Sequence, residues 1–138
     1  MKANELMIGD WVRIVDDDTN QYFETRITGI SDLGNIYAPL PEGEHSYPFA
    51  AECADPIPLT REILEQNGWS EDYNAETDIL GHHFPEDKDL NLELYISDVD
   101  ETVVWTLNCY EYGVLPLRYV HELQHALRLC GIDKEITI

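Results

Sequence analysis

Near its C-terminus the chain contains two histidines whose spacing could hold a metal ion. His121, Glu122 and His125 occupy the fixed positions of the zincin signature HExxH, inside a segment with helical periodicity. On a helix the two histidines lie on one face and can ligate zinc, and the glutamate can activate a zinc-bound water. These residues would therefore support a zinc-dependent hydrolase.

The neighbours of the two histidines argue against a metal site. Arg118 and Arg128 lie on the same polar arc of the helix, and fixed positive charges oppose the binding of a divalent cation. The metzincin pattern requires Gly and His downstream, where this chain has Arg128 and Gly131. So short a pattern also arises by chance. We therefore predict that the chain is not an enzyme and has no cofactor, and the zinc hydrolase is kept as an alternative.

The helix that must position these side chains is predicted over residues 117–130 and ends at the following glycine. Its apolar residues form one arc, which we expect to pack on a sheet. His121 and His125 lie near the middle of the opposite arc, so both imidazoles are expected to point away from the packed side. Together with Arg118 and Arg128 they form a candidate protein-interaction face.

Two other sets of residues could carry chemistry. Residues 98–102 read DVDET, which resembles the nucleophile motif of haloacid dehalogenase phosphatases, but too few residues follow to build the parallel sheet of those enzymes. An aspartate-rich turn explains the same residues. His82 and His83 are adjacent in a predicted strand, so they should point to opposite faces. A third zinc ligand would have to come from these upstream residues, whose positions the sequence does not fix.

Residues 1–59 are predicted to form a small, mostly antiparallel β lobe. Short strands are expected, between turns, at residues 10–15, 22–30 and 35–40. Within the second strand Phe23, Thr25 and Ile27 alternate with polar residues, which is typical of a half-buried strand. A Gly-Asp pair before the first strand is similar to the start of SH3-like small barrels. The lobe is therefore predicted to be an SH3-like β barrel.

Residues 60–138 are predicted to form a second, α-β-β-β-α lobe. Pro56 and Pro58 enforce an extended path before it, and Thr60 can cap its first helix, which is expected to end at Gly68. An antiparallel β-meander then packs against the two helices, with strands expected at residues 78–84, 90–97 and 102–109. A short C-terminal strand is expected at residues 135–138. The predicted fold class is α+β.

The chain is very acidic, since 28 Asp and Glu against 8 Lys and Arg give a formal net charge of -20. This charge repels nucleic acids and anionic membranes, so neither is an expected partner, and a basic protein is the favoured class. The acids are dense between Glu71 and Glu101, and such an array of carboxylates could imitate the phosphates of DNA. A DNA-mimic inhibitor is therefore a second functional hypothesis.

The cysteines and the first residues indicate a cytoplasmic setting. Cys53, Cys109 and Cys130 are odd in number and lack CxxC spacing, and no apolar segment of a signal peptide follows the first residues. No apolar run approaches the roughly 18 residues that a membrane-spanning helix needs. We therefore expect a reduced, cytoplasmic protein with no membrane segment.

Three segments together resemble a family of small uncharacterised bacterial and phage-associated proteins. They are the start ELMIGDWV, the middle PIPLTREIL and the tail YVHELQ. In that family the tail reads VHxLQN, with Asn where this chain has His125. The resemblance thus implies that a zinc ligand at this position would be peculiar to this chain. It also implies a mobile-element origin, and it attaches no activity.

The favoured hypothesis is a non-enzymatic, cytoplasmic interaction or accessory protein of bacterial or phage origin. Its partner is predicted to be a protein rather than a nucleic acid. DNA mimicry and zinc-dependent hydrolysis by the predicted helix at residues 117–130 are the two alternatives.

Overall fold

A computed structural model of the chain describes residues 1–16, 21–74, 79–83, 90–96, 103–109 and 113–138. Side chains are described for residues 1–15, 21–69, 105–106 and 116–138. The chain forms two compact units, Met1–Ile57 and Pro58–Ile138, and each is described by itself. The described residues form small antiparallel sheets and two α-helices, so the predicted α+β class is confirmed. Neither of these helices is long and apolar enough to cross a membrane.

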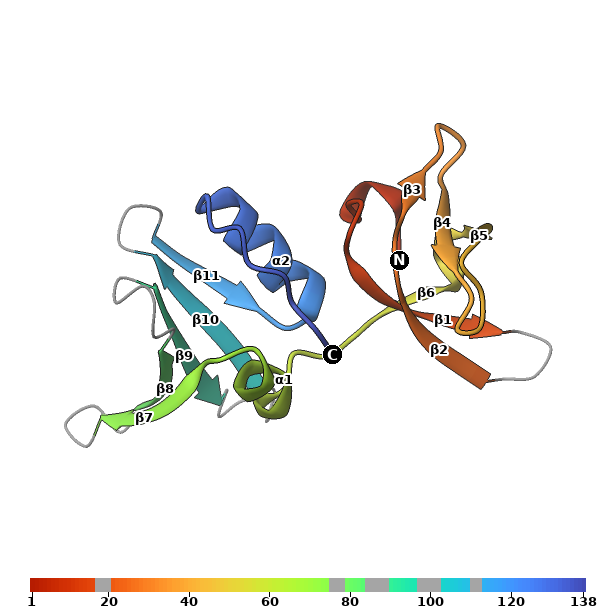
Figure 1. The fold of residues 1–138 in the computed structure, drawn as a ribbon. Helices are drawn as coiled ribbons and strands as arrows, with labels where there is room; N and C mark the ends of the chain where they lie inside the picture. The colour runs from red at the N-terminus through yellow and green to blue at the C-terminus, as the bar shows by residue number, and fades with distance from the viewer. Residues whose placement is uncertain (17–20, 75–78, 84–89, 97–102, 110–112) are drawn as a thin grey trace. The chain divides into compact units, whose positions relative to one another are not determined.

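The described part of the first unit consists of short strands and two 3-10 helices. In chain order they are η1 (Ala3–Glu5), β1 (Trp11–Asp16), β2 (Gln21–Arg26), β3 (Gly29–Ile30), β4 (Asn35–Pro39), β5 (Ser46–Ala50), η2 (Ala51–Cys53) and β6 (Ala54–Pro56). The strands form two three-stranded antiparallel sheets, in the orders β2-β1-β6 and β3-β4-β5 (Figure 1). The described strands form no closed barrel, so the first lobe is established only as a small β unit.

The chain passes from the first sheet to the second between β2 and β3. The N–H of Ile27 donates to the carbonyl of Asp10 (2.9 Å), next to the start of β1. The N–H of Thr28 instead donates to the carbonyl of Tyr37 on β4 (2.8 Å). The prediction of one strand at residues 22–30 is therefore wrong, because the backbone changes its hydrogen-bonding partner inside that range.

A Gly-Asp pair forms a tight turn before β1. Gly9 has a φ of 93°, a conformation that favours glycine because it lacks a Cβ. Asp10 is fully buried, and its Oδ2 accepts from the N–H of Met7 at 2.7 Å. The pair thus fixes the direction in which β1 enters the sheet.

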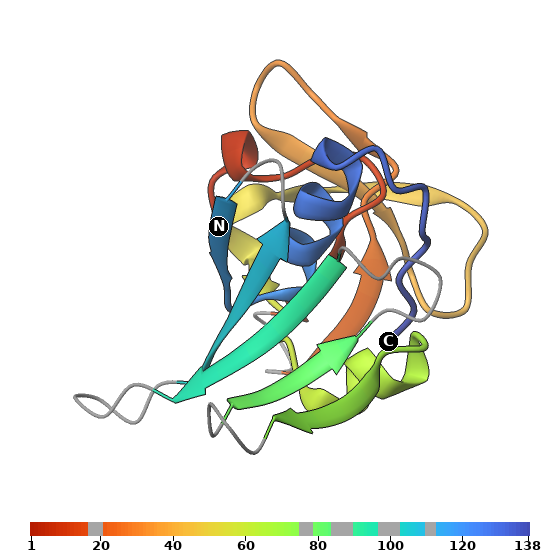
Figure 2. The same ribbon diagram turned by 90° about the vertical axis from the view of Figure 1, so that its left-hand side faces the viewer.

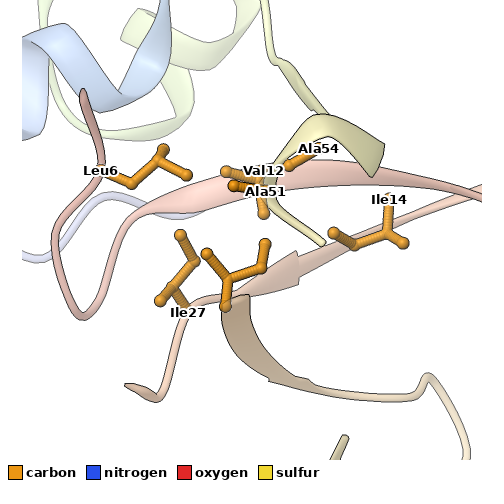
Figure 3. Close-up of a cluster of buried hydrophobic side chains, with 7 residues drawn as sticks. Leu6, Val12, Ile14, Ile27, Ala51 and Ala54 are labelled. Carbon is orange, nitrogen blue, oxygen red and sulfur yellow. The ribbon is translucent and has the colours of Figure 1, made fainter. Parts of the chain in front are cut away.

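The core of the first unit takes aliphatic side chains from both sheets (Figure 3). Its buried members are Leu6, Val12, Ile14, Ile27, Ile36, Ala51 and Ala54. Thr25 and Ile27 are buried whereas Glu24 is exposed, which confirms the alternation predicted for this strand. At the margin of the core Phe23 and Phe49 pack edge to face, with ring centroids 6.1 Å apart.

The second unit contains two α-helices and five strands in its described part. In chain order they are α1 (Arg61–Gln66), β7 (Ser70–Asn74), β8 (Ile79–His83), β9 (Leu90–Ile96), β10 (Val103–Cys109), β11 (Gly113–Leu117) and α2 (Val120–Leu129). The strands form one antiparallel meander in the order β11-β10-β9-β8-β7. The three predicted strands correspond to β8, β9 and β10, and two further strands flank them.

Helix α2 lies against one face of this sheet, as Figure 1 and Figure 2 show. Buried side chains come from the helix and from two strands: Val120, Leu123, Leu127, Trp105 and Leu117. The apolar arc predicted for the helix is therefore correct. The helix starts later than predicted, because Leu117 pairs with Trp105 as the last residue of β11.

The tail after α2 is held by a side chain rather than by a strand. The Nδ2 group of Asn67 donates to the carbonyls of Ile63 and Thr137, both at 2.7 Å, and Oδ1 accepts from the N–H of Thr137 at 2.9 Å. Asn67 and Ile136 are both buried. The strand predicted at residues 135–138 is therefore wrong, since the backbone of Thr137 pairs with the Asn67 amide. We call this contact the Asn67–Thr137 clamp.

Thr60 caps α1, as predicted. Its hydroxyl oxygen accepts from the N–H of Ile63 at 3.3 Å. The pKa of Glu62, in the first turn, is lowered from its ordinary value of 4.5 by a hydrogen bond from its own backbone N–H and by one from the Thr60 hydroxyl. Because the folded-state pKa lies below the unfolded one, this contribution to stability is present at neutral pH. It is lost as the pH falls through the folded-state pKa.

We expect Thr60→Ala to lower the free energy of unfolding by about 1 kcal/mol at pH 7, because one N–H at the start of α1 loses its acceptor. The variant should also lose less stability between pH 7 and about pH 3 than the parent does, since the Glu62 carboxylate loses a donor. Urea denaturation at both pH values measures this. Glu62→Gln, which cannot ionise, should reduce the pH dependence while keeping the cap. An identical pH dependence in parent and both variants would contradict this account.

Candidate functional site

The carboxylate of Glu122 caps the start of α2. Its Oε2 accepts from the backbone N–H groups of Arg118 (2.6 Å) and Tyr119 (3.1 Å). A negative charge at a helix N-terminus is stabilised by the helix dipole. Two backbone donors on one oxygen fix the carboxylate at this place, which gives the glutamate of the HExxH pattern a structural role.

The two histidines of the pattern lie next to each other on α2. The ring centroids of His121 and His125 are 5.7 Å apart, with an interplanar angle of 77°, and the ring of His121 also stacks on Tyr119 at 5.8 Å. His121 is only 6% exposed, whereas His125 is half-buried. The expectation that both imidazoles point away from the packed side is therefore wrong for His121, which is buried. The buried arc of α2 also takes in the polar residue Gln124, so it is wider than the apolar arc.

The two arginines of the candidate interaction face are both exposed. Arg128 lies in the last turn of α2, where a positive charge interacts favourably with the helix dipole. Arg118 precedes the helix and donates its N–H to Glu122. Of the predicted face, Arg118, His125 and Arg128 thus reach the surface, and His121 does not.

The described residues contain no group of three or more His, Cys, Asp or Glu that could hold a metal ion. The other candidate zinc ligands from the sequence are His82, His83 and the turn at Asp98. The side chains of His82 and His83, and the whole of Asp98, lie outside the described residues. The same holds for the side chains between Glu71 and Glu101, on which the DNA-mimic hypothesis rests.

The outer face of the β3-β4-β5 sheet is a feature that the sequence analysis missed. Gly29, Tyr37 and Pro48 form one row across the three strands. The side chain of Tyr37 covers Gly29, since a Cβ added to the glycine would lie 3.5 Å from the tyrosine Cδ2. Asn35 and Ala50 form the next row of the same face, because they lie two residues along their strands. We call these five residues the Tyr37 face.

The Tyr37 face is partly exposed, and the segment of chain that contains it is acidic. Tyr37 and Pro48 are exposed, whereas Ile36 and Ala38, the neighbours of Tyr37 along β4, are buried. Residues 27–57 contain no Lys or Arg. The acids of that segment are all exposed, namely Asp32, Glu42, Glu44, Glu52 and Asp55. The alternation around Tyr37 and the absence of basic residues are the sequence signals that could have revealed this face.

The chain matches no protein-family model, no curated protein and no solved structure. The candidate sites therefore rest on the residues and contacts of the chain itself. The resemblance of three segments to bacterial and phage-associated proteins stays a prediction.

Proposed function

We propose that the chain is a non-enzymatic interaction protein that binds a positively charged protein. The observation that most supports a non-enzymatic role is the position of Glu122, whose carboxylate accepts from two backbone N–H groups at the start of α2. A glutamate held in this way caps a helix, so the catalytic pattern that the sequence analysis kept as an alternative has a structural explanation.

The net charge of -20 favours a basic partner. Opposite charges steer two proteins toward each other and raise their rate of association, whereas like charges repel nucleic acids and anionic lipids. We place this binding in the cytoplasm of a bacterium or of a phage-infected cell, as the sequence suggests.

Metal analysis and partner identification together test the proposal. The protein, purified without chelator and without a histidine tag, should hold no stoichiometric zinc, and His125→Ala should leave its metal content unchanged. Cross-linking in bacterial cells followed by mass spectrometry should recover a protein of positive net charge. Its complex should weaken steeply as salt rises above about 0.15 M, because salt screens exposed charges. One equivalent of zinc that His125→Ala removes, or a strongly acidic partner, would contradict the proposal.

We also propose that the two units are separate domains and that the first is an SH3-like barrel. Two observations support the barrel. The two small sheets share one aliphatic core, and the chain passes from the first sheet to the second between Ile27 and Thr28. The sequence places the boundary between residues 59 and 60. The contacts of Leu59 favour a boundary before Pro58, because its N–H donates to the carbonyl of Arg118 (2.8 Å) and its carbonyl accepts from Trp105 Nε1 (2.9 Å).

A fragment of residues 58–138 should be more stable than one of residues 60–138. Without Leu59 the Nε1 group of the buried Trp105 loses its acceptor, and leaving a buried donor unpaired costs on the order of 1–3 kcal/mol. Urea denaturation followed by circular dichroism measures the difference. A fragment of residues 56–138 is the control, and it should match the fragment of residues 58–138. Equal stability of all three would show that Leu59 does not belong to the second unit.

A further inference from the structure

We infer that the Tyr37 face is the docking site for an extended, basic segment of the partner protein. This inference rests on the proposed function and adds where the partner binds and in which conformation. The face consists of Gly29, Asn35, Tyr37, Pro48 and Ala50, and none of these residues is charged. An exposed tyrosine among small side chains offers a flat surface on which an extended backbone can lie.

The chemistry of the face suits positively charged side chains. Tyr37 is 37% exposed, and an aromatic ring attracts a guanidinium or ammonium group above its plane. The surrounding segment, residues 27–57, supplies only negative charge, because it has acids and no Lys or Arg. Charge complementarity therefore selects a basic occupant.

The acids are placed at both ends of β4. Asp32 lies in the turn before the strand, and Glu42 and Glu44 lie in the loop after it. The strand has five residues, and at a rise of about 3.4 Å per residue its ends are roughly 14 Å apart. An extended segment that lies along β4 would span the same distance with basic residues four positions apart, a separation that also places both side chains on the same face of the segment. The partner segment should therefore carry two basic residues at that spacing.

The partner should lie on the face of the sheet and not add a strand to its edge. β5 is an edge strand of this sheet, and Pro48 stands in its middle. The carbonyl of Tyr37, opposite Pro48, accepts from Thr28 on the β3 side, so the backbone of Pro48 points away from β4. Proline has no N–H at this outward position, which removes a donor that an added strand would need.

The outer face of the first sheet suits a basic segment much less. Arg13 lies over the ring of Tyr22 at 4.2 Å and forms an ion pair with Glu24 at 2.9 Å. Arg26 lies over the ring of Trp11 at 5.6 Å. The aromatic rings of that face are thus covered by the protein's own cations, which would repel a basic partner. Within the first unit the charge pattern singles out the Tyr37 face.

A titration of the full-length, ¹⁵N-labelled protein with a synthetic peptide tests this inference. The probe is the pentapeptide Arg-Val-Thr-Val-Arg, acetylated and amidated, and the comparison peptide has the same composition with adjacent arginines. The probe should shift the backbone amides of residues 29–39 and 46–50 and bind more tightly than the comparison peptide. Its dissociation constant should rise several-fold between about 20 and 200 mM salt, because the contacts are exposed ion pairs.

Substitutions on the Tyr37 face should weaken binding of the probe peptide, and matched substitutions elsewhere should leave its affinity unchanged. Tyr37→Thr, which keeps a residue suited to a strand, should raise the dissociation constant roughly two- to fivefold. Glu42→Gln combined with Glu44→Gln should raise it roughly threefold or more. Tyr22→Thr is the control for the aromatic change. Glu65→Gln combined with Asp133→Asn is the control for the change in charge, and both controls should leave the affinity unchanged.

The outcomes separate the docking site from the proposed function. No binding at low salt, equal affinity for the two peptides, or equal losses in Tyr37→Thr and Tyr22→Thr would overturn the docking site. Recovery of a basic partner from cells would then still uphold the proposed function, with its contact elsewhere on the chain. Chemical-shift changes confined to the amides of the Tyr37 face would uphold the inference, provided that they disappear in a folded Tyr37→Thr variant.

Discussion

Replacing Asn67 by alanine should lower the free energy of unfolding of the second unit by about 2–4 kcal/mol. The variant loses every hydrogen bond of the Asn67–Thr137 clamp and leaves the carbonyls of Ile63 and Thr137 without their amide donor. Ile136, which is fully buried beside the clamp, also loses the contact that fixes the tail. Urea denaturation followed by far-ultraviolet circular dichroism measures the effect.

Two further variants show whether the clamp causes this loss. Gln66→Ala removes an exposed side chain one residue earlier on α1, so it should change stability by less than about 0.5 kcal/mol. Thr137→Ala keeps the backbone groups that Asn67 binds and loses only the Oγ1 contact at 3.3 Å, so its effect should also be small. A loss in Asn67→Ala no larger than in Gln66→Ala would refute the clamp.

Replacing Trp105 by alanine should lower the free energy of unfolding by about 3–5 kcal/mol. Trp105 is 2% exposed on β10, so the variant leaves a large cavity in the core of the second unit. It also leaves the carbonyl of Leu59 without the Nε1–H donor, which lies 2.9 Å away. Guanidinium denaturation followed by circular dichroism is the suitable measurement, because tryptophan fluorescence changes with the substitution itself.

Trp105→Phe separates packing from hydrogen bonding at this position. Phenylalanine keeps most of the buried ring but cannot donate to Leu59, so the expected loss is smaller, about 1–3 kcal/mol. Tyr22→Ala removes an aromatic ring that is 61% exposed on β2, and it should change stability by less than about 0.5 kcal/mol. If Trp105→Ala cost no more than Tyr22→Ala, β10 could not be the centre of this core.

The parts of the fold that follow from neighbouring residues were predictable from the sequence. Thr60 caps α1, and Gly68 and Gly131 follow the two helices with φ values of 90° and 73°, as helix-ending glycines do. The alternation from Phe23 to Ile27 gave the buried face of β2. Such signals depend on propensity and periodicity, which are properties of a short stretch of chain.

The parts that depend on distant residues were not predictable. The clamp joins Asn67 to Thr137, which are 70 positions apart, and no local sequence pattern indicates that the two residues are in contact. The passage of the chain from the first sheet to the second at Thr28 depends on the position of β4, whose Tyr37 carbonyl accepts from the Thr28 N–H. The burial of His121 likewise depends on packing around α2, whereas a helical wheel ranks residues only by their own polarity.

The HExxH pattern of residues 121–125 is compatible with two roles for its glutamate, a helix cap and a zincin site. Glu122 stands four residues after Arg118 and three after Tyr119, a spacing that suits a helix cap as well as it suits a zincin. The sequence could not decide between these roles, and the positions of the hydrogen-bond donors favour the cap. The Tyr37 face escaped notice for a different reason, because its five residues come from three strands that only the fold brings together.

Pro48 also bears on how the protein behaves at high concentration. A regular strand at the border of a sheet can recruit the same strand of another molecule and start fibrillar growth. A proline in the middle of β5 interrupts that template, and the carboxylates of Glu42 and Glu44 in the adjoining loop repel a second copy that approaches it. The same residue that directs a partner onto the flat side of the sheet thus guards the molecule against amyloid-like self-assembly.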